Sequence, residues 1–418
     1  MEFGKRRLKL GIVPLCDCAP LVVAKERGFF VEQDLEVELT RESSWASIRD
    51  KVAVGALDGA QMLAAMPFSA TLGLGNVRTP ISTALGLNVG GNAITVSEEL
   101  YTRMCAADPE AMAQRPVTAR ALRRVIEGDR RAGRPLMTFA SVYPFSPHNY
   151  ELRAWLAEAG IDPERDVRLV VVPPPQMVPN LSAGNIVGYC VGEPWNGLAA
   201  SLGLGRALIT SREIWGGRVE KVLGVRQSWI DEAPDAHKAL LKALLLAAQW
   251  ADRPENRAEV AEIIARPAYV NAPLEIVRLA LERPDFMIFH RYAANFPWRS
   301  QALWYLVQMR RWGQLPRSVD MRRAADEVFR ADLYRLAALE LGLPVPLTDW
   351  KTEGLHDGPW TLTDATQPIE MGADAFFDAS VFDPGRAEAL AEAYAENPLG
   401  ANGGAGPRAA NRERGREG

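Results

Sequence analysis

Two residues of the chain have the chemistry and the position to bind an anion. His148 follows Ser146 and Pro147, which begin a predicted helix, so its imidazole lies beside free backbone N–H groups and the positive end of the helix dipole. Lys221 lies in the short strand pattern 219–224, where its charge could neutralise a ligand. Each has an ordinary alternative: a histidine that is solvent-exposed or satisfied in the core, and a solvated lysine.

Trp45 and Gly192 also follow predicted strands, where ligands of α/β proteins bind. The indole of Trp45 could form a flat wall for a planar ligand, or it could begin a helix and pack in the core. Gly192 lies where a strand runs into a helix, and the missing side chain lets the backbone approach a ligand closely. Glu193 and Trp195 beside it could be wall or hinge, and the alternative is an ordinary strand-to-helix turn.

The sequence carries no motif of a known catalytic centre. It contains no G-x-S-x-G elbow, H-E-x-x-H helix, phosphate-binding loop or dinucleotide fingerprint. Cys16 and Cys18 suggest a metal or redox pair, but alternate residues of a strand point to opposite sides and lack the spacing of known sites. We interpret both as packing residues, and we predict no catalytic residue, cofactor or metal.

Composition places the chain among ordinary globular proteins with room for two cores. The 418 residues include 48 Lys plus Arg and 52 Asp plus Glu, a net charge of -4, which predicts no direct nucleic-acid or membrane partner. Four cysteines fit a reducing compartment. The first residues lack the apolar segment of an export signal, so we expect an unexported, cytoplasmic protein.

Hydrophobic patterns predict two sets of strands alternating with helices, typical of parallel sheets covered on both faces. Asp17 is expected to cap a helix that begins at Pro20 and ends at Gly28. From Asp235 the pattern is amphipathic helix. The predicted strands are 8–12, 35–39, 61–63, 81–85, 94–96, 136–141, 167–172 and 187–191; the predicted helices include 45–54, 120–131, 147–159 and 194–202.

Glycines at 90 and 91 interrupt the first set, and the composition changes again near residue 221. We therefore predict that residues 1–91 begin lobe 1, that 92–220 form lobe 2, and that 221–397 return to lobe 1. Residues 398–418 have almost no large apolar side chains and are predicted to be a disordered tail.

Five stretches resemble a known family, the nitrate and bicarbonate solute-binding proteins of ABC transporters. They are 17–30, 44–50, 58–61, 171–178 and 190–196, and the resemblance spans about residues 8–395. It implies an α/β fold, the periplasmic-binding-protein type II clamshell, with two lobes, a helical C-terminal extension and a ligand held in the cleft.

The resemblance also implies a nitrate site, which could accept nitrite. The positions that match the family's site are Trp45, Asn92, His148, Gly192 and Lys221. Lys221 would supply the counter-charge, Asn92 and His148 would donate hydrogen bonds in the nitrate plane, Gly192 would add a backbone donor, and Trp45 would exclude water. Asn92 departs from the family, since transport members usually carry the longer glutamine there.

Unexported members of this family resemble nitrate sensors of the NasS type. Such a sensor holds an ANTAR-domain antiterminator protein inactive and releases it when nitrate binds, which we adopt as the functional hypothesis. A longer segment between Tyr101 and Pro135, with an extra basic helix, could be the partner surface. The alternatives are the solute-binding component of a nitrate, nitrite or bicarbonate ABC transporter, and an enzyme built on the same clamshell.

Overall fold

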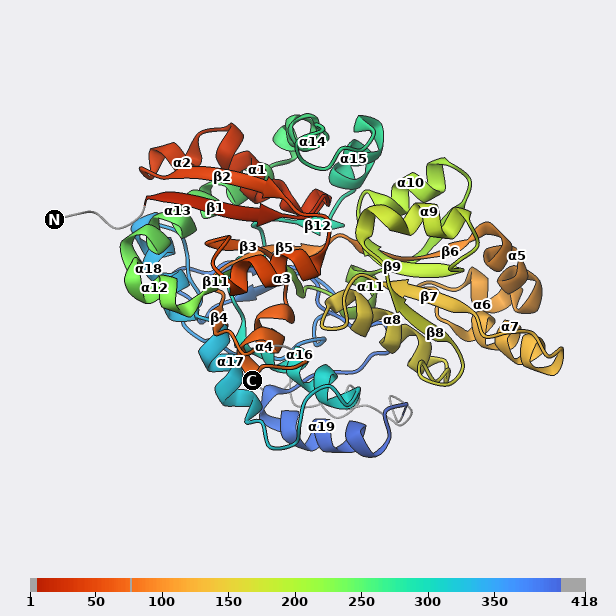
Figure 1. Cartoon of the computed structure of the whole chain (residues 1–418). Helices are drawn as coiled ribbons and strands as arrows, with labels where there is room; N and C mark the ends of the chain where they lie inside the picture. Colours follow the sequence, from red (N-terminus) through yellow and green to blue (C-terminus); the bar gives the residue numbers. More distant parts are fainter. Residues whose placement is uncertain (1–5, 76, 400–418) are drawn as a thin grey trace.

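Two separate β-sheets divide the protein into two lobes that lie side by side (Figure 1). The structure is a computed structural model and describes residues 6–75 and 77–399. The first sheet has the order β12-β5-β11-β3-β1-β2, with β4 paired to β11. Its strands are β1 (Arg7–Ile12), β2 (Glu36–Arg41), β3 (Gly59–Leu63), β4 (Ile81–Ser82), β5 (Gly86–Gly90), β11 (Val219–Arg226) and β12 (Met287–Ile288).

The second sheet has five strands in the order β10-β6-β9-β7-β8. It is built from the segment between the two parts of the first sheet. Its strands are β6 (Asn92–Ser97), β7 (Thr138–Ser141), β8 (Arg168–Val171), β9 (Gly188–Gly192) and β10 (Gly205–Thr210). A third, two-stranded sheet near the C-terminus consists of β13 (Trp360–Leu362) and β14 (Ile369–Met371).

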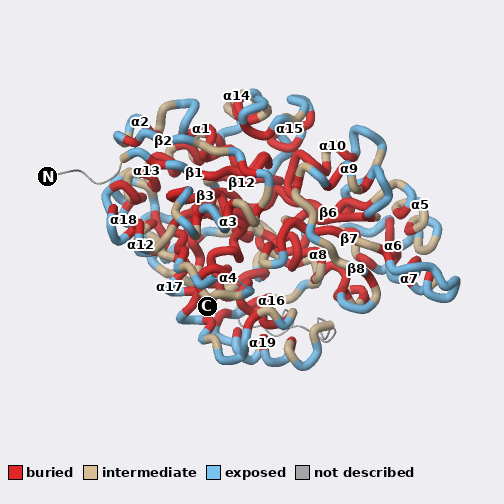
Figure 2. The backbone as a smooth tube through the Cα atoms, viewed as in Figure 1, coloured by how far each residue is buried: buried red, intermediate tan, exposed pale blue. Residues whose placement is uncertain are grey.

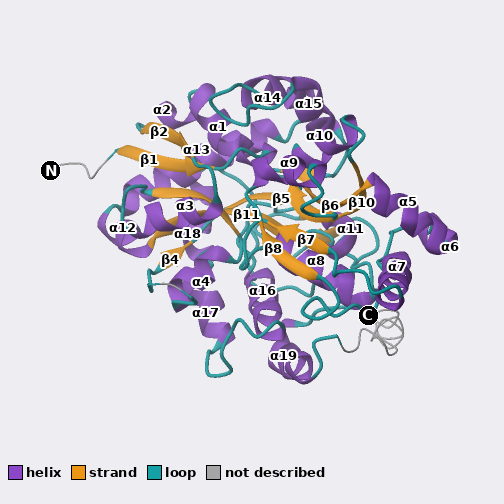
Figure 3. Cartoon of the chain, turned by 45° about the vertical axis from the view of Figure 1, so that its right-hand side comes forward, coloured by secondary structure: helices purple, strands orange, loops and turns teal. Residues whose placement is uncertain are grey.

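Helices cover both faces of each sheet (Figure 3). Helix α13 packs on α1 and α18, so the C-terminal helices return to the first lobe. The helices from residues 16–72 and 227–340 are η1 (Cys16–Cys18), α1 (Ala19–Glu26), α2 (Phe29–Glu32), α3 (Trp45–Ala53), α4 (Met66–Leu72), α12 (Gln227–Glu232), α13 (Pro234–Ala251), η3 (Pro254–Asn256), α14 (Arg257–Ile264), α15 (Leu274–Glu282), α16 (Arg299–Arg311), α17 (Met321–Val328) and α18 (Ala331–Glu340).

The second lobe carries a helical insertion before β7, which consists of α5 (Glu98–Ala107), α6 (Pro109–Ala113) and α7 (Arg120–Arg131). Its other helices are α8 (Pro147–Glu158), η2 (Pro174–Gln176), α9 (Met177–Ser182), α10 (Trp195–Ser201) and α11 (Ser211–Trp215). At the C-terminal end, η4 (Pro384–Arg386) precedes the last helix, α19 (Ala387–Glu396), which packs on α16. Within the described residues, no helix has both the length and the apolar character needed to cross a bilayer. From residue 400 on, the predicted disordered tail lies outside the described residues.

The prediction of wholly parallel sheets is wrong at the strands that begin where the chain crosses between the lobes. Strand β1 is parallel to β2 and β3, but β11 is antiparallel to β3, and β6 is antiparallel to β9. The register explains this, because Asn92 at the start of β6 lies opposite Gly192 at the end of β9. A strand that arrives from the other lobe starts at the edge where the parallel strands end.

The strand predicted at 81–85 is also different, because only residues 81–82 form a strand there (β4) and the next strand, β5, begins at Gly86. Thr83 leaves the sheet, forms a bridge with Phe329, and donates its N–H to the carbonyl of Val328 at 2.8 Å. This partner lies far along the chain at the end of α17. A local pattern cannot reveal such a pairing.

The lobes are closed on one another. One continuous apolar core runs from the first lobe into the second, and the buried part of the backbone in Figure 2 continues between them. The indole of Trp195 in the second lobe donates to the Pro14 carbonyl at 3.2 Å. Tyr150 donates to Gln314 Oε1 at 2.7 Å, and Gln314 Nε2 donates to the Pro144 carbonyl at 3.2 Å.

These contacts generate a prediction about lobe closure. Gln314→Ala removes two hydrogen bonds between the lobes, each contributing about 1 kcal/mol. We expect the ligand-free variant to be more open, with a larger radius of gyration in solution X-ray scattering. Gln114→Ala, an exposed change within the second lobe, is the control. Equal radii for the two variants would show that Gln314 does not hold the lobes together.

Candidate functional site

The five residues predicted to form a site converge where the two lobes meet. Asn92 and Gly192 pair across β6 and β9, at the edge of the second sheet. The Lys221 ammonium, from β11 of the first sheet, lies 5.7 Å from the centre of the Trp45 ring. His148 Nδ1 lies 3.4 Å from Glu220 Oε1, an oxygen that also contacts Lys221.

Helix starts position two of these residues. Ser146 caps α8 by accepting the Asn149 N–H at 3.0 Å, and Pro147 occupies the first turn, so His148 is held inside that turn. Ser44 caps α3 in the same way and fixes Trp45 as its first residue. The helix-start interpretation of both residues is therefore correct, and both side chains are buried.

Lys221 is fully buried and holds two carboxylates. Its ammonium lies 2.9 Å from Asp17 Oδ2 and 2.9 Å from Glu220 Oε1. Burial acts to lower the pKa of Lys221, but the charges of Asp17 and Glu220 more than offset this and raise it. Lys221 is therefore charged, and its charge is already compensated by protein carboxylates rather than free for a ligand.

Sequence reasoning missed the role of Asp17, which was predicted to cap a helix. Its side chain makes no capping bond in η1 and points instead to Lys221 and to the amide of Gln61. Gln61 Oε1 in turn accepts the Val13 N–H at 2.8 Å. Both residues fall in stretches that carry the family resemblance, but only the packing of β1, β3 and β11 brings them to the site.

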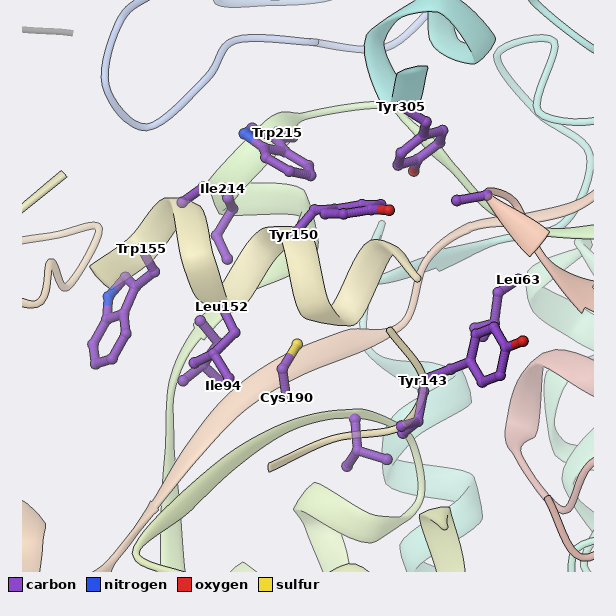
Figure 4. Packing of buried hydrophobic residues seen from close by; sticks show 14 of the residues in the cluster. Leu63, Ile94, Tyr143, Tyr150, Leu152, Trp155, Cys190, Ile214, Trp215 and Tyr305 are labelled. Atoms are coloured by element: carbon purple, nitrogen blue, oxygen red, sulfur yellow. The ribbon is translucent and has the colours of Figure 1, made fainter. Parts of the chain in front are cut away.

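Glu151 and Glu220 were also missed. Asn92 Nδ2 donates to Glu151 Oε2 at 3.3 Å, and the Cys190 thiol lies 3.6 Å from the same oxygen. Figure 4 shows Cys190 beside α8 on the side of Ile94 and Leu152. Burial raises the pKa of Glu151 to about 8, with a further increase from the charge of Glu220. At neutral pH the Glu151 carboxyl is therefore mostly protonated.

Several buried polar atoms at the site have no hydrogen-bond partner within residues 6–75 and 77–399. They are Trp45 Nε1, both ring nitrogens of His148, and Asn92 Oδ1. Leaving such a group unsatisfied costs about 1–3 kcal/mol. Burial, and then the charge of Lys221, lower the pKa of His148 well below its usual value, so the ring is neutral and has one N–H to donate. The arrangement suits a small polar ligand enclosed by the two lobes.

Gly192 favours the tight fit of the cleft. A Cβ added there would lie 3.3 Å from Asn92 Oδ1 and 3.3 Å from Asp17 Oδ2, which belong to different lobes. A side chain at this position would separate the polar groups that face each other. The close-approach interpretation of Gly192 therefore agrees with the geometry.

The cysteine pair has no polar role in the described structure. Cys16 and Cys18 lie in the 3-10 helix η1 rather than in the expected strand, and both are free and fully buried. Burial raises the pKa of both thiols, which keeps them protonated. Within the described residues, no group of three or more His, Cys, Asp or Glu side chains is arranged to hold a metal ion.

The ion pairs of Lys221 generate a prediction about stability. Lys221→Met leaves Asp17 and Glu220 buried without a cation, which costs roughly 3–5 kcal/mol. Burial already raises the pKa of both carboxyls, and losing Lys221 raises it further. Because such carboxyls oppose folding only when ionised, we expect a larger loss of unfolding free energy at pH 8 than at pH 5.

Denaturant unfolding at the two pH values measures this effect. Lys238→Met, which breaks a surface pair with Glu340, is the control and should change stability by less than about 1 kcal/mol. If Lys221→Met lowers the unfolding free energy equally at both pH values, the loss does not come from the Asp17 and Glu220 carboxylates left without their cation.

Comparison with known proteins places this geometry in context. Residues 2–265 match the NMT1-like family. The nitrate/nitrite binding protein NrtA of Nostoc sp. (strain PCC 7120) is 32% identical over 402 residues, 91% of this chain and 84% of that protein. The nitrate import ATP-binding protein NrtC of Synechocystis sp. (strain PCC 6803) is 40% identical over 369 residues, 85% of this chain but 53% of NrtC. The chain thus spans about half the length of NrtC.

Solved structures show the same fold. The periplasmic nitrate-binding protein NrtA from Synechocystis PCC 6803 matches with a TM-score of 0.81 and 29% identity, over 94% of this chain and 99% of that one. The alkanesulfonate-binding protein SsuA from Xanthomonas axonopodis pv. citri matches with a TM-score of 0.57 and 15% identity, over 77% and 98% of the two chains, which supports the fold alone. The predicted clamshell is confirmed. The NrtA relatives are binding proteins, which agrees with the predicted non-enzymatic role.

Proposed function

The chain belongs to the NMT1-like family, and from this premise we propose that it is a nitrate-binding protein of the NrtA type, with nitrite as a second possible ligand. The observation that carries the proposal is the set of buried, unpartnered polar atoms around Lys221, in the cleft between the lobes. A planar anion with three acceptor oxygens is the kind of ligand such donors suit.

Each residue has a distinct role in this proposal. The neutral His148 ring donates one N–H, and the Trp45 indole N–H can donate a second hydrogen bond while the ring shields the ligand from water. Lys221 supplies the positive field, although Asp17 and Glu220 share it. Binding of the ligand therefore depends more on directed hydrogen bonds than on the net charge of the site.

Calorimetry with sodium nitrate tests the proposal. We expect His148→Ala to lower the affinity at least tenfold, because about 1.4 kcal/mol of hydrogen bonding is lost. His237→Ala is the matched control, since His237 is also buried and has a lowered pKa but lies on α13 away from the cleft. Nitrate affinity unchanged by His148→Ala would remove His148 from the site, and tighter binding of bicarbonate than of nitrate would overturn the choice of ligand.

We further propose, as the finer role, a sensor that holds an ANTAR-domain antiterminator and releases it when nitrate binds. A surface groove of about 930 Å³ supports this role, because a partner bound in it would sense lobe closure. Arg123 and Glu158 of the second lobe form one wall, and Arg311 and Asp378, from α16 and the C-terminal segment, form the other. A partner seated there would contact both walls, so its affinity would change when the lobes move.

Mixing the purified chain with the antiterminator and titrating nitrate tests this role. We expect a complex without nitrate that dissociates as nitrate is added, and we expect Arg123→Glu to weaken the complex without changing nitrate affinity. Arg165→Glu, an exposed change outside the groove, is the control. A complex indifferent to nitrate would contradict the sensor role, and stimulation of a transporter ATPase by the liganded chain would favour the transport role instead.

A further inference from the structure

The cleft contains more buried carboxyl groups than its one lysine can neutralise. Asp17, Glu151 and Glu220 are all buried around the single ammonium of Lys221. With His148 neutral, these residues include one cation and three acidic groups. A monoanion that enters this enclosure adds a further negative charge, which is costly in a buried site unless one of the acids is neutral.

Among these three acids, Glu151 is the one that forms no ion pair with a described residue. Asp17 and Glu220 each lie 2.9 Å from the Lys221 ammonium, which favours their ionised forms. The Glu151 carboxyl instead contacts the Asn92 amide and the Cys190 thiol, which are both neutral. The proton is therefore expected on Glu151.

Asn92 links the protonation of Glu151 to the ligand. In this structure its Nδ2 group faces the Glu151 carboxyl, so its Oδ1 atom is the end near Gly192, without a hydrogen-bond partner among the described residues. An acceptor at that end repels an anion. A protonated Glu151 can donate an O–H hydrogen bond to Oδ1. The Asn92 amide then turns by half a rotation, so that Oδ1 faces Glu151 and Nδ2 faces the cleft.

We propose that Glu151 is a specificity-determining residue that makes the cleft bind its anion together with one proton. The proton neutralises the third carboxyl and orients the Asn92 amide as a donor to the anion. The ligand class is a monoanion, since a second negative charge on the ligand would add to the repulsion from the ionised Asp17 and Glu220 carboxylates. This inference rests on the proposed nitrate site and concerns how that site selects its ligand.

Other titratable and charged groups around Glu151 do not supply the proton between pH 7 and 9. Burial raises the pKa of the Cys190 thiol and of the Tyr305 hydroxyl, so both keep their protons. The charges of Asp17 and Glu220 raise the pKa of Lys221, which therefore also stays protonated. His148 stays neutral because burial lowers its pKa. The groups that face Glu151 are Cys190 from β9, Glu220 and Lys221 from β11, Tyr305 from α16, Arg218 before β11, and His148 on its own helix.

The expected pH dependence follows from the pKa of Glu151 near 8 in the free protein. Only the protonated form binds, so nitrate affinity is nearly constant below pH 7 and falls about tenfold between pH 7 and pH 9. Proton uptake on binding rises from about 0.1 per nitrate at pH 7 to about 0.9 at pH 9. Calorimetry in two buffers of different ionisation enthalpy measures this uptake on the unmodified protein.

Glu151→Gln provides the sharpest variant, because its amide donates to Asn92 Oδ1 at every pH. We expect it to bind sodium nitrate equally well at pH 7 and pH 9 and to take up no proton. Glu158→Gln is the matched control: Glu158 lies two turns further along α8, burial also raises its pKa, and it faces Arg120 rather than the cleft. This control should keep the tenfold loss of affinity.

The outcomes separate this inference from the proposed function. Nitrate binding with the same affinity from pH 7 to 9 and no proton uptake would overturn the role of Glu151 and leave nitrate binding intact. A pH dependence that persists in Glu151→Gln would overturn it as well. If Glu151→Gln does not fold, proton uptake by the unmodified protein still decides. No nitrate binding at any pH from 6 to 9 would overturn the proposed function itself.

Discussion

The buried ammonium of Lys221 is the interaction on which the cleft depends. It reaches from β11, the strand that brings the chain back to the first lobe, to Asp17 in the first helical turn after β1. A charge taken out of water must be paired, so these two distant parts of the chain cannot separate without a large cost. The ion pair therefore fixes the cleft floor whether or not a ligand is present.

The antiparallel strands explain why the polar residues meet at one place. The segments that cross between the lobes start new strands at the edge where the parallel strands end, which places Asn92 and Lys221 at the bottom of the cleft. Gly192 ends a parallel strand at the same edge, and its missing side chain lets the two lobes approach. Closure then brings the first turn of α8 over Lys221, so ligand binding and lobe movement are coupled through the same residues.

Burial gives the site its chemical character. Within this enclosure the histidine is neutral, the lysine is shared by two carboxylates, and a third carboxyl lies beside an amide. Such a site distinguishes ligands by the number and direction of their acceptor atoms and by their total charge, because water cannot screen the difference. A strongly positive pocket would attract anions without this selectivity.

The sequence by itself determined the order of most strands and helices and the family. It also predicted five site residues, which the fold brings close together. Local signals carried these predictions: alternating apolar residues in β1, Ser146 and Pro147 at the start of α8, and continuous stretches of family resemblance. They did not reveal strand direction, the division of β4 from β5, or the partners of the site residues.

Only the tertiary structure decided that Lys221 is already paired, that Asp17 serves the cleft instead of capping a helix, and that Glu151 lies against Asn92. Asn92 and Glu151 are 59 residues apart along the chain. Lys221 comes from β11, whereas Asp17 lies just after β1. Protonation depends on burial and on charges within a few ångströms, and these distances exist only after the two lobes have folded and closed. A residue's type is written in the sequence, but its charge state is set by what surrounds it.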